Sequence, residues 1–274
     1  MASNYFKWLG QKIRSLGEEL EGHFIATSTR EDAIVRGQVL GASPFNSYGR
    51  FVATGAEVNH IIWPDGVFNI PASSGVQMSI VSGSANDDGS PVGTGIRTMD
   101  IHYLDNTLTP QTETITLNGT TAVLTVATNI RFIQCMHIVT VGSLKAAAGI
   151  ITASNGGITY AQIDAGSRRC ASSARMVPAG KVLYIKGAIG SSISGTAAAG
   201  AQIKLSSTYF DGHDLTADLV FMPFGSVGVQ DTTTAYAFPV PAGPFPAGTI
   251  VAMEVTVDKA AIITGDWFGY LENT

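Results

Sequence analysis

The chain contains few charged residues and few cysteines. Lys, Arg, Asp and Glu together make up 14% of its 274 residues, whereas an average soluble protein has about 25%. A surface with so little charge is suited to burial against neighbouring subunits. The two cysteines, Cys135 and Cys170, are not part of a C-x-x-C motif, so the sequence indicates neither a disulfide framework nor a zinc site.

The features that mark nucleic-acid-binding and membrane proteins are missing as well. The net charge is −5 and no run of Lys and Arg occurs, so we expect no nucleic-acid partner. No apolar stretch approaches the roughly 20 residues that span a bilayer, so we expect no membrane partner. Residues 1–20 carry several charges where a secretory signal peptide has an apolar segment, and we therefore expect assembly in the cytoplasm.

Motifs of catalysis and ligand binding are also lacking. The chain has no G-x-S-x-G nucleophile motif, and Gly93-Thr94-Gly95 lacks the third glycine of a phosphate-binding loop. The segment Asn86-Asp87-Asp88-Gly89 offers oxygen ligands for calcium, but such clusters are foremost turn sequences. The histidines are widely separated along the chain, at His23, His60, His102, His137 and His213. We expect no enzymatic activity, no cofactor and no metal ion.

Residues 3–22 carry the one convincing helical pattern. Five apolar residues recur at alternating steps of three and four, which places them in a narrow seam on one helix face. They are Phe6, Leu9, Ile13, Leu16 and Leu20. Gly10 and Gly17 each weaken such a helix by about 1 kcal/mol relative to Ala, so we expect the seam to pack against something. Its partner is either the chain's own β domain or another molecule.

We favour the second of these alternatives and predict two domains. Residues 1–22 form an N-terminal amphipathic helical arm that attaches the protein to a partner, and residues 26–32 form a polar linker behind it. Residues 23–274 form the body.

From Phe24 onward the hydrophobic pattern has the period of two that is typical of strands. Residues 97–103 place Met99, Ile101 and Tyr103 on one face and polar residues on the other. Residues 131–141 are apolar on both faces, so we expect this strand at the centre of a sheet.

Turn sequences separate the predicted strands. Asn118-Gly119 lies between two alternating runs and predicts a hairpin of strands 111–117 and 120–126 joined by a type I′ turn. Three copies of Pro-Ala-Gly, at residues 178–180, 241–243 and 246–248, predict tight turns that start strands. Strand runs without interleaved helices favour an all-β fold, an antiparallel, jelly-roll-like β-sandwich.

One block of the chain resembles virion structural proteins of tailed bacteriophages, of the head accessory (decoration) or head–tail type. An Asn-Asp loop at residues 81–89 is followed by Gly93-Thr-Gly-Ile-Arg-Thr98, a Leu-Asp turn at residues 104–105, and the run 113–123. The likeness covers residues 78–155, and this chain departs from it by inserting residues 90–92. The resemblance implies a particle component and brings no catalytic residues with it.

These observations lead to one hypothesis and two alternatives. We expect a non-enzymatic bacteriophage virion protein, a head decoration (cement) protein that assembles in the host cytoplasm. Its partners are copies of itself, preferably as a trimer, and the capsid, portal or tail. One alternative is a head–tail collar or tail-fibre component with a receptor- or glycan-binding platform made of Trp63, Tyr160, Tyr209, Phe210, Trp267 or Tyr270. The other is a depolymerase, whose paired carboxylates would come from Asp100, Glu113, Asp164, Asp211, Asp214, Asp218 or Glu254.

Overall fold

The computed structural model of the chain describes residues 30–193, 200–208, 224–227 and 232–274. The chain divides into two units, residues 1–44 and 45–274. In the first unit the described helix is α2 (Arg30–Val35), which ends where the backbone N–H of Gly37 donates to the carbonyl of Ile34 at 2.9 Å. The linker prediction is therefore wrong for residues 30–32, which begin this helix. The predicted arm, with Phe6, Leu9, Ile13, Leu16 and Leu20, lies outside the described residues, as does the boundary at residue 22. No helix in the described ranges is long and apolar enough to cross a membrane.

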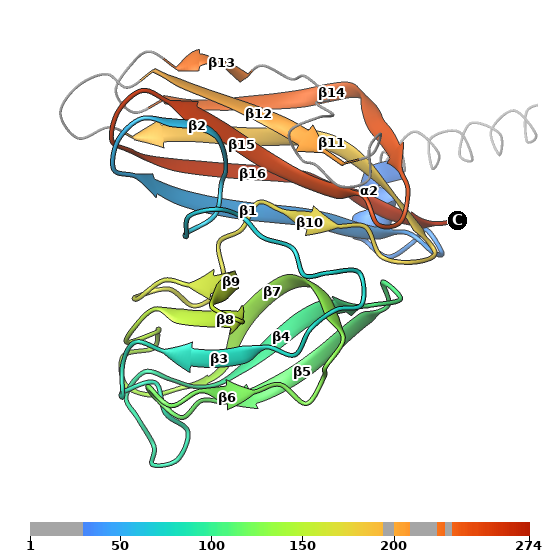
Figure 1. The fold of residues 1–274 in the computed structure, drawn as a ribbon. Helices are drawn as coiled ribbons and strands as arrows, with labels where there is room; N and C mark the ends of the chain where they lie inside the picture. Colours follow the sequence, from blue (N-terminus) through green and yellow to red (C-terminus); the bar gives the residue numbers. More distant parts are fainter. Residues whose placement is uncertain (1–29, 194–199, 209–223, 228–231) are drawn as a thin grey trace, which may run out of the picture. The chain divides into compact units, whose positions relative to one another are not determined.

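The second unit contains a jelly roll made of two sheets (Figure 1). One sheet has the order β1 (Ser43–Ala53), β16 (Ala261–Asn273), β11 (Lys181–Ile193) and β14 (Thr232–Phe245). In the other, β2 (Glu57–Ile61) and β10 (Arg175–Met176) pair with one edge of β15 (Ile250–Val257), followed by β12 (Ala201–Ser207) and β13 (Phe224–Val227).

The order of these strands identifies the jelly roll. Apart from β10, these two sheets contain eight strands, which are β1, β2 and β11 to β16. When the eight are numbered along the chain, the first sheet has the order 1-8-3-6 and the second has the order 2-7-4-5. This is the order of an eight-stranded jelly roll with its two Greek keys. The pairs with defined register are antiparallel. The predicted all-β, antiparallel sandwich is confirmed.

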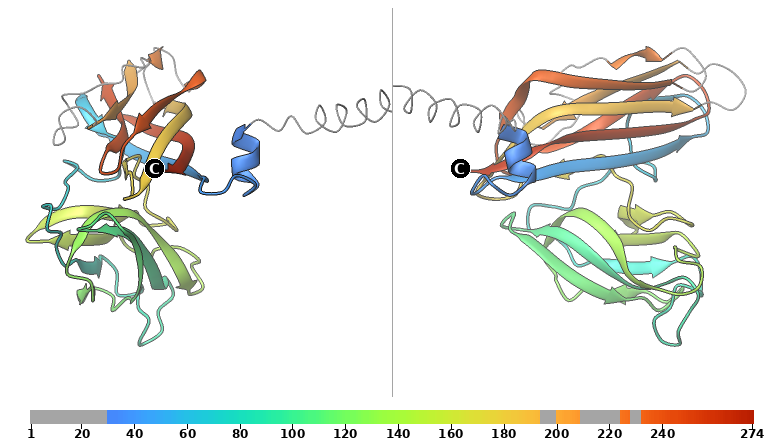
Figure 2. Two further views of the ribbon diagram at one scale, coloured as in Figure 1. Left: turned by 90° about the vertical axis from the view of Figure 1, so that its right-hand side faces the viewer. Right: turned by 180° about the vertical axis from the view of Figure 1, so that it is seen from behind.

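A second sandwich is inserted between β2 and β10 (Figure 1, cyan to yellow-green; Figure 2). One of its sheets has the order β6 (Val123–Leu124), β3 (Ser79–Ser82), β8 (Ile151–Asn155) and β9 (Ile158–Ile163). The other has β5 (Pro110–Thr116), β4 (Ile96–Asp105) and β7 (Ile130–Val141). Residues of both sheets share one hydrophobic core, so this insertion has an interior of its own.

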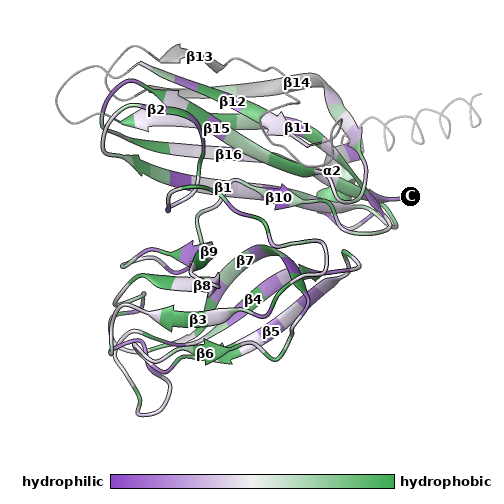
Figure 3. Ribbon diagram, in the orientation of Figure 1, coloured by the Kyte–Doolittle hydropathy of each residue, from purple (hydrophilic) through white to green (hydrophobic). Residues whose placement is uncertain are grey.

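Alternating side chains build both interiors. In β4, Met99, Ile101 and Tyr103 are buried as predicted, and green and purple bands alternate along this strand in Figure 3. In the jelly roll, Trp267 and Met253 are fully buried from opposite sheets. The indole N–H of Trp267 donates to the carbonyl of Ser173 at 2.8 Å, which satisfies the ring's single polar group inside the core.

The strand predicted at residues 131–141 is present as β7, but its predicted central place is wrong. β4 lies at the centre of the sheet and β7 at its edge. Residues 168–170 cover that edge without forming a strand. The N–H of Ile138 donates to the carbonyl of Arg168 at 3.1 Å, and that of Cys170 to the carbonyl of Met136 at 2.9 Å. The apolar side chains of β7 pack in two clusters: Met136 lies in the core of the inserted sandwich, and Phe132 lies in a separate cluster with Leu104 and Met176.

The predicted hairpin around Asn118-Gly119 is also wrong. β5 pairs with β4, whereas β6 pairs with β3, so the turn connects two different sheets. Gly119 has φ of +56° and Asn118 is not in the positive-φ region, whereas a type I′ turn requires both. The backbone of Gly119 instead forms hydrogen bonds with the backbone of Ser82 and Asp87. Because these bonds hold the turn against residues 82–87, β5 and β6 do not pair with each other.

Two of the three Pro-Ala-Gly copies form the predicted turns. The N–H of Lys181 donates to the carbonyl of Pro178, and that of Thr249 to Pro246, with positive φ at Gly180 and Gly248. The third copy, at residues 241–243, lies inside β14 and is not a turn. Its Ala242 pairs with Ile185 in the sheet, where the register of β11 and β14 shifts.

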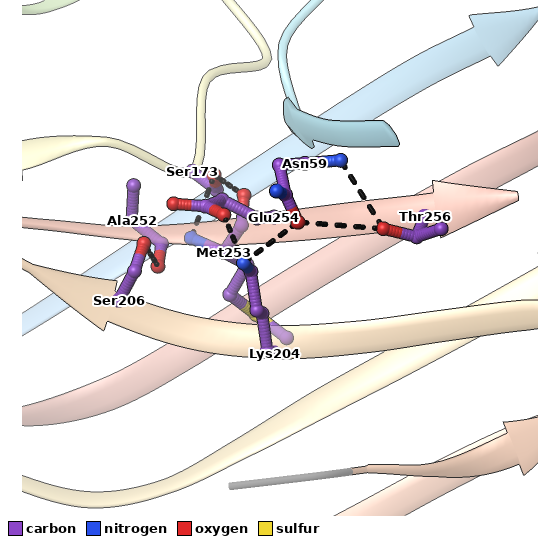
Figure 4. Close-up of polar contacts among 8 residues, drawn as sticks. All are labelled: Asn59, Ser173, Lys204, Ser206, Ala252, Met253, Glu254 and Thr256. Carbon is purple, nitrogen blue, oxygen red and sulfur yellow. Dashed lines mark hydrogen bonds and ion pairs between the residues drawn. The ribbon is translucent and has the colours of Figure 1, made fainter. Parts of the chain in front are cut away.

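A buried ion pair lies on β12 and β15 of the jelly roll (Figure 4). The ammonium of Lys204 is 2.8 Å from a carboxylate oxygen of Glu254, and it donates to the side-chain carbonyl of Asn59 at 2.8 Å. The Lys204 and Glu254 side chains are 10% and 1% exposed. Because Asn59 belongs to β2, this cluster connects three adjacent strands.

We expect Glu254→Ala to lower the free energy of unfolding by about 3–5 kcal/mol, because it leaves the buried Lys204 ammonium without its counter-charge. The double variant Lys204→Met with Glu254→Leu should recover most of this loss, since neither buried charge remains. Urea denaturation followed by circular dichroism measures both. A loss below about 1 kcal/mol in the single variant would show that the pair is dispensable.

Candidate functional site

The Asn86-Asp87-Asp88 loop is built around the carboxylate of Asp87, which is fully buried. One carboxylate oxygen accepts the N–H of Ile96 at 2.7 Å and that of Ala148 at 2.9 Å. The other accepts the hydroxyl of Ser82 at 2.6 Å and the N–H of Gly149 at 2.9 Å. Four donors face the carboxylate where a calcium site would place further oxygens. The loop is therefore a structural junction, and the calcium interpretation is not supported.

The glycines of the neighbouring turn are explained by the same junction. A Cβ atom on Gly93 would overlap the carbonyl oxygen of Asn86, and one on Gly95 would overlap the carboxylate of Asp87. The Gly-Thr-Gly sequence thus allows the backbone to approach Asp87 closely. This is a packing requirement and not a phosphate-binding loop.

The aromatic residues proposed for a glycan platform are mostly buried. Trp63, Trp267 and Tyr270 are 1%, 0% and 7% exposed, and the Trp63 indole donates to the carbonyl of Gly66 at 2.8 Å. Tyr160 packs against the core of the inserted sandwich. Tyr209 and Phe210 lie outside the described residues. The described members of this set do not form an exposed sugar-binding surface.

The carboxylates proposed for a depolymerase have structural partners where the structure describes them. Glu113 accepts the N–H groups of Val126 and Ala127 at 2.6 and 3.1 Å. Asp164 is 3.4 Å from the guanidinium of Arg50, and Glu254 is in the buried ion pair. Asp100 accepts the hydroxyl of Thr114 at 2.5 Å. The remaining candidates, Asp211, Asp214 and Asp218, lie outside the described residues.

The two cysteines lie together although they are 35 positions apart. Both are free thiols with their sulfur atoms 3.5 Å apart. Their hydrogen bond raises the pKa of Cys135 and lowers that of Cys170. They line a polar pocket of about 70 Å³ with Arg169, Arg175 and Asp266. This volume is far below the roughly 300 Å³ of a typical small-molecule site.

Two of the histidines that the sequence shows as scattered also meet. His102 on β4 and His137 on β7 stack with ring centroids 4.7 Å apart and an interplanar angle of 12°. The side-chain oxygen of Asp100 is 3.9 Å from His137. The residues are separated by 35 positions, so spacing along the chain could not reveal this group; only the pairing of β4 with β7 creates it.

The outer face of the jelly-roll sheet β1-β16-β11-β14 carries exposed apolar side chains. Phe268 is 41% exposed, and Ile189 and Ile193 are 38% and 47% exposed. Ile189 pairs with Asp266 and Gly187 with Phe268, so Phe268 and Ile189 are diagonal neighbours on adjacent strands. A group of exposed apolar residues on a sheet face is typical of a surface that contacts another protein.

No family of known proteins matches this chain, and no curated protein matches it. Among solved structures it is similar to infectious bursal disease virus, Gx strain, with 9% identity over 85% of this chain and 71% of that chain and a TM-score of 0.24. The VP2 subviral particle of the same virus has 9% identity over 85% and 72%, with a TM-score of 0.25. At these values the likeness carries no conclusion about the fold or the function of this chain.

We expect Asp87→Asn to destabilise the inserted sandwich by about 3 kcal/mol or more. The amide nitrogen of Asn would face backbone N–H donors, and the charge-assisted hydrogen bonds, about 1.5–3 kcal/mol each, would be lost. Asp88→Asn is the matched control, because its side-chain oxygen can still accept the N–H of Ser90, now at 2.7 Å. Thermal melting measures both. Equal melting temperatures for the two variants would contradict the junction described above.

Proposed function

We propose that this protein is a non-enzymatic structural component of a tailed-bacteriophage virion, and within that class a head decoration protein. The observation that carries the proposal is the jelly-roll strand order, 1-8-3-6 against 2-7-4-5, with a second sandwich inserted between strands two and three. Jelly rolls build viral capsid domains, and they also occur in lectins and cupins. The choice among these classes must come from the residues, because a fold alone does not define a function.

The residues favour the virion class over the other two. A cupin holds its ligands inside the sandwich, whereas this interior is filled by side chains such as Trp267, Met253 and Leu183. A lectin presents exposed aromatic or polar groups to a sugar, whereas Trp63 and Trp267 are buried. The block that resembles tailed-phage virion proteins contains the junction around Asp87. The hydrogen bonds of the Asp87 carboxylate join the motifs of this block, which explains why the motifs occur together.

Self-association is the second part of the proposal. The chain has few charges, and Phe268, Ile189 and Ile193 are exposed on one sheet face. We propose a homo-oligomer, preferably a trimer, whose N-terminal arm, residues 1–22, attaches it to the capsid, portal or tail. A head–tail collar or tail component remains the alternative position in the particle.

The oligomer is tested by light scattering coupled to gel filtration. We expect the full chain to have three times the mass of one chain at micromolar concentration. Phe268→Asp with Ile189→Asp should shift the protein toward monomer, because two charges would be placed in an apolar contact. Glu272→Gln, on the same strand, is the control. A full chain that is monomeric at every concentration would overturn the proposed self-association.

The arm is tested by binding to particles of the phage that encodes the protein. A variant lacking residues 1–22, and the full chain with Leu9→Asp and Leu16→Asp, should stay soluble and folded but should fail to incorporate. Mass spectrometry of purified particles measures the occupancy. Unchanged occupancy of the truncated variant would place the attachment on the β body, and absence of the wild-type chain from particles would overturn the virion role.

A further inference from the structure

Three metal-ligating side chains lie on the outer face of the sheet β5-β4-β7. Asp100 and His102 are two positions apart on β4 and therefore point to the same side. His137 on β7 lies directly opposite Asp100 in the register. Met99 and Ile101, which alternate with them along the strand, are fully buried in the core. The three polar side chains thus share the face of the sheet that points away from the core.

Their ligand atoms are close enough to hold one ion. One atom from each of Asp100, His102 and His137 lies within 4.8 Å of the others. The ring nitrogens Nε2 of His102 and Nδ1 of His137 are 3.1 Å apart. A tetrahedral zinc ion with Zn–N bonds of about 2.0–2.1 Å holds neighbouring nitrogens roughly 3.3 Å apart. The separation observed between the two imidazoles is near this value.

The third strand orients two of these side chains. Thr112 on β5 is 2.9 Å from Nδ1 of His102, and the hydroxyl of Thr114 donates to Asp100 at 2.5 Å. If Nδ1–H of His102 donates to Thr112, the lone pair of its Nε2 points toward His137. A fixed tautomer held by an outer hydrogen bond is the usual arrangement around a metal-binding histidine.

The charge of the group also suits a cation. Two ring nitrogens at 3.1 Å can share only one proton, and a divalent ion can replace it. Asp100 supplies a negative charge to the group.

We propose that Asp100, His102 and His137 form a zinc-binding site on the inserted sandwich, with water in the fourth position. Two imidazoles and one carboxylate are a ligand set that zinc accepts. The rings now stack with an interplanar angle of 12°, so the His137 ring must turn for both lone pairs to meet at one ion. Its side chain is 42% exposed and has room to do so.

Isothermal titration of the full-length, metal-free protein with zinc chloride tests the proposal. We expect one ion per chain, tighter binding at pH 7.5 than at pH 5.5, and a raised melting temperature with zinc. Asp100→Asn and His137→Ala should each weaken binding by at least about 10-fold, and Thr112→Val should weaken it less, because it removes only the outer hydrogen bond. Thr98→Ala, on the same face of the same strand, is the matched control.

A cobalt titration detects metal binding by a signal that does not depend on the stability of the protein. Co²⁺ in this site should give visible absorption bands that are lost in His137→Ala, and the melting temperature of each metal-free variant shows whether it is folded. Absence of zinc heat and of cobalt absorption in the wild type would overturn the site. Unchanged binding in folded Asp100→Asn with His137→Ala would overturn it as well, because the ion would then bind elsewhere.

Discussion

The carboxylate of Asp87 is the interaction on which the inserted sandwich depends. Its four hydrogen bonds connect the end of β3, the start of β4 and the loop before β8, and these segments belong to both sheets. The backbone of the same residue accepts the N–H of Gly119, which joins the turn between β5 and β6 to the junction. One residue therefore sets the positions of four segments, three through its side chain and one through its backbone. The glycines of the nearby Gly-Thr-Gly turn allow the backbone to approach its carboxylate oxygens closely.

The jelly roll depends on a different feature. Some of its neighbouring strands are far apart in the sequence. β2 pairs with β15, almost 200 residues later, and β1 is a neighbour of β16. The first two strands are thus held by the last two, and residues between β2 and β10 can form a separate domain without changing the sheet order. The ion pair of Lys204 and Glu254, with Asn59, reinforces this long-range contact (Figure 4).

The sequence predicted the local features well and the long-range ones poorly. The period of two identified β4 and its buried face, and Pro-Ala-Gly identified the turns before β11 and β15. The same reasoning failed at Asn118-Gly119, because a hairpin signal is local whereas the competing bonds to Ser82 and Asp87 come from a distant loop. The meeting of His102 with His137, and of Cys135 with Cys170, depends on strand pairing and could not be read from spacing. The insertion was missed for a related reason: both sandwiches use the same period, so no change in pattern marks the boundary between them.

Two outer sheet faces, one on each sandwich, differ in the side chains at their centres. The outer face of β11 and β16 is apolar where Ile189 and Phe268 are exposed. The outer face of β4, β5 and β7 instead carries Asp100, His102 and a pair of threonines, Thr98 and Thr140, whose hydroxyls are 2.7 Å apart. Apolar exposure is removed from water by contact between subunits, whereas a polar face is stable in solvent. On the proposed function, Ile189 and Phe268 would lie in the contact between subunits, whereas Asp100, His102 and His137 would stay on a face that needs no such contact.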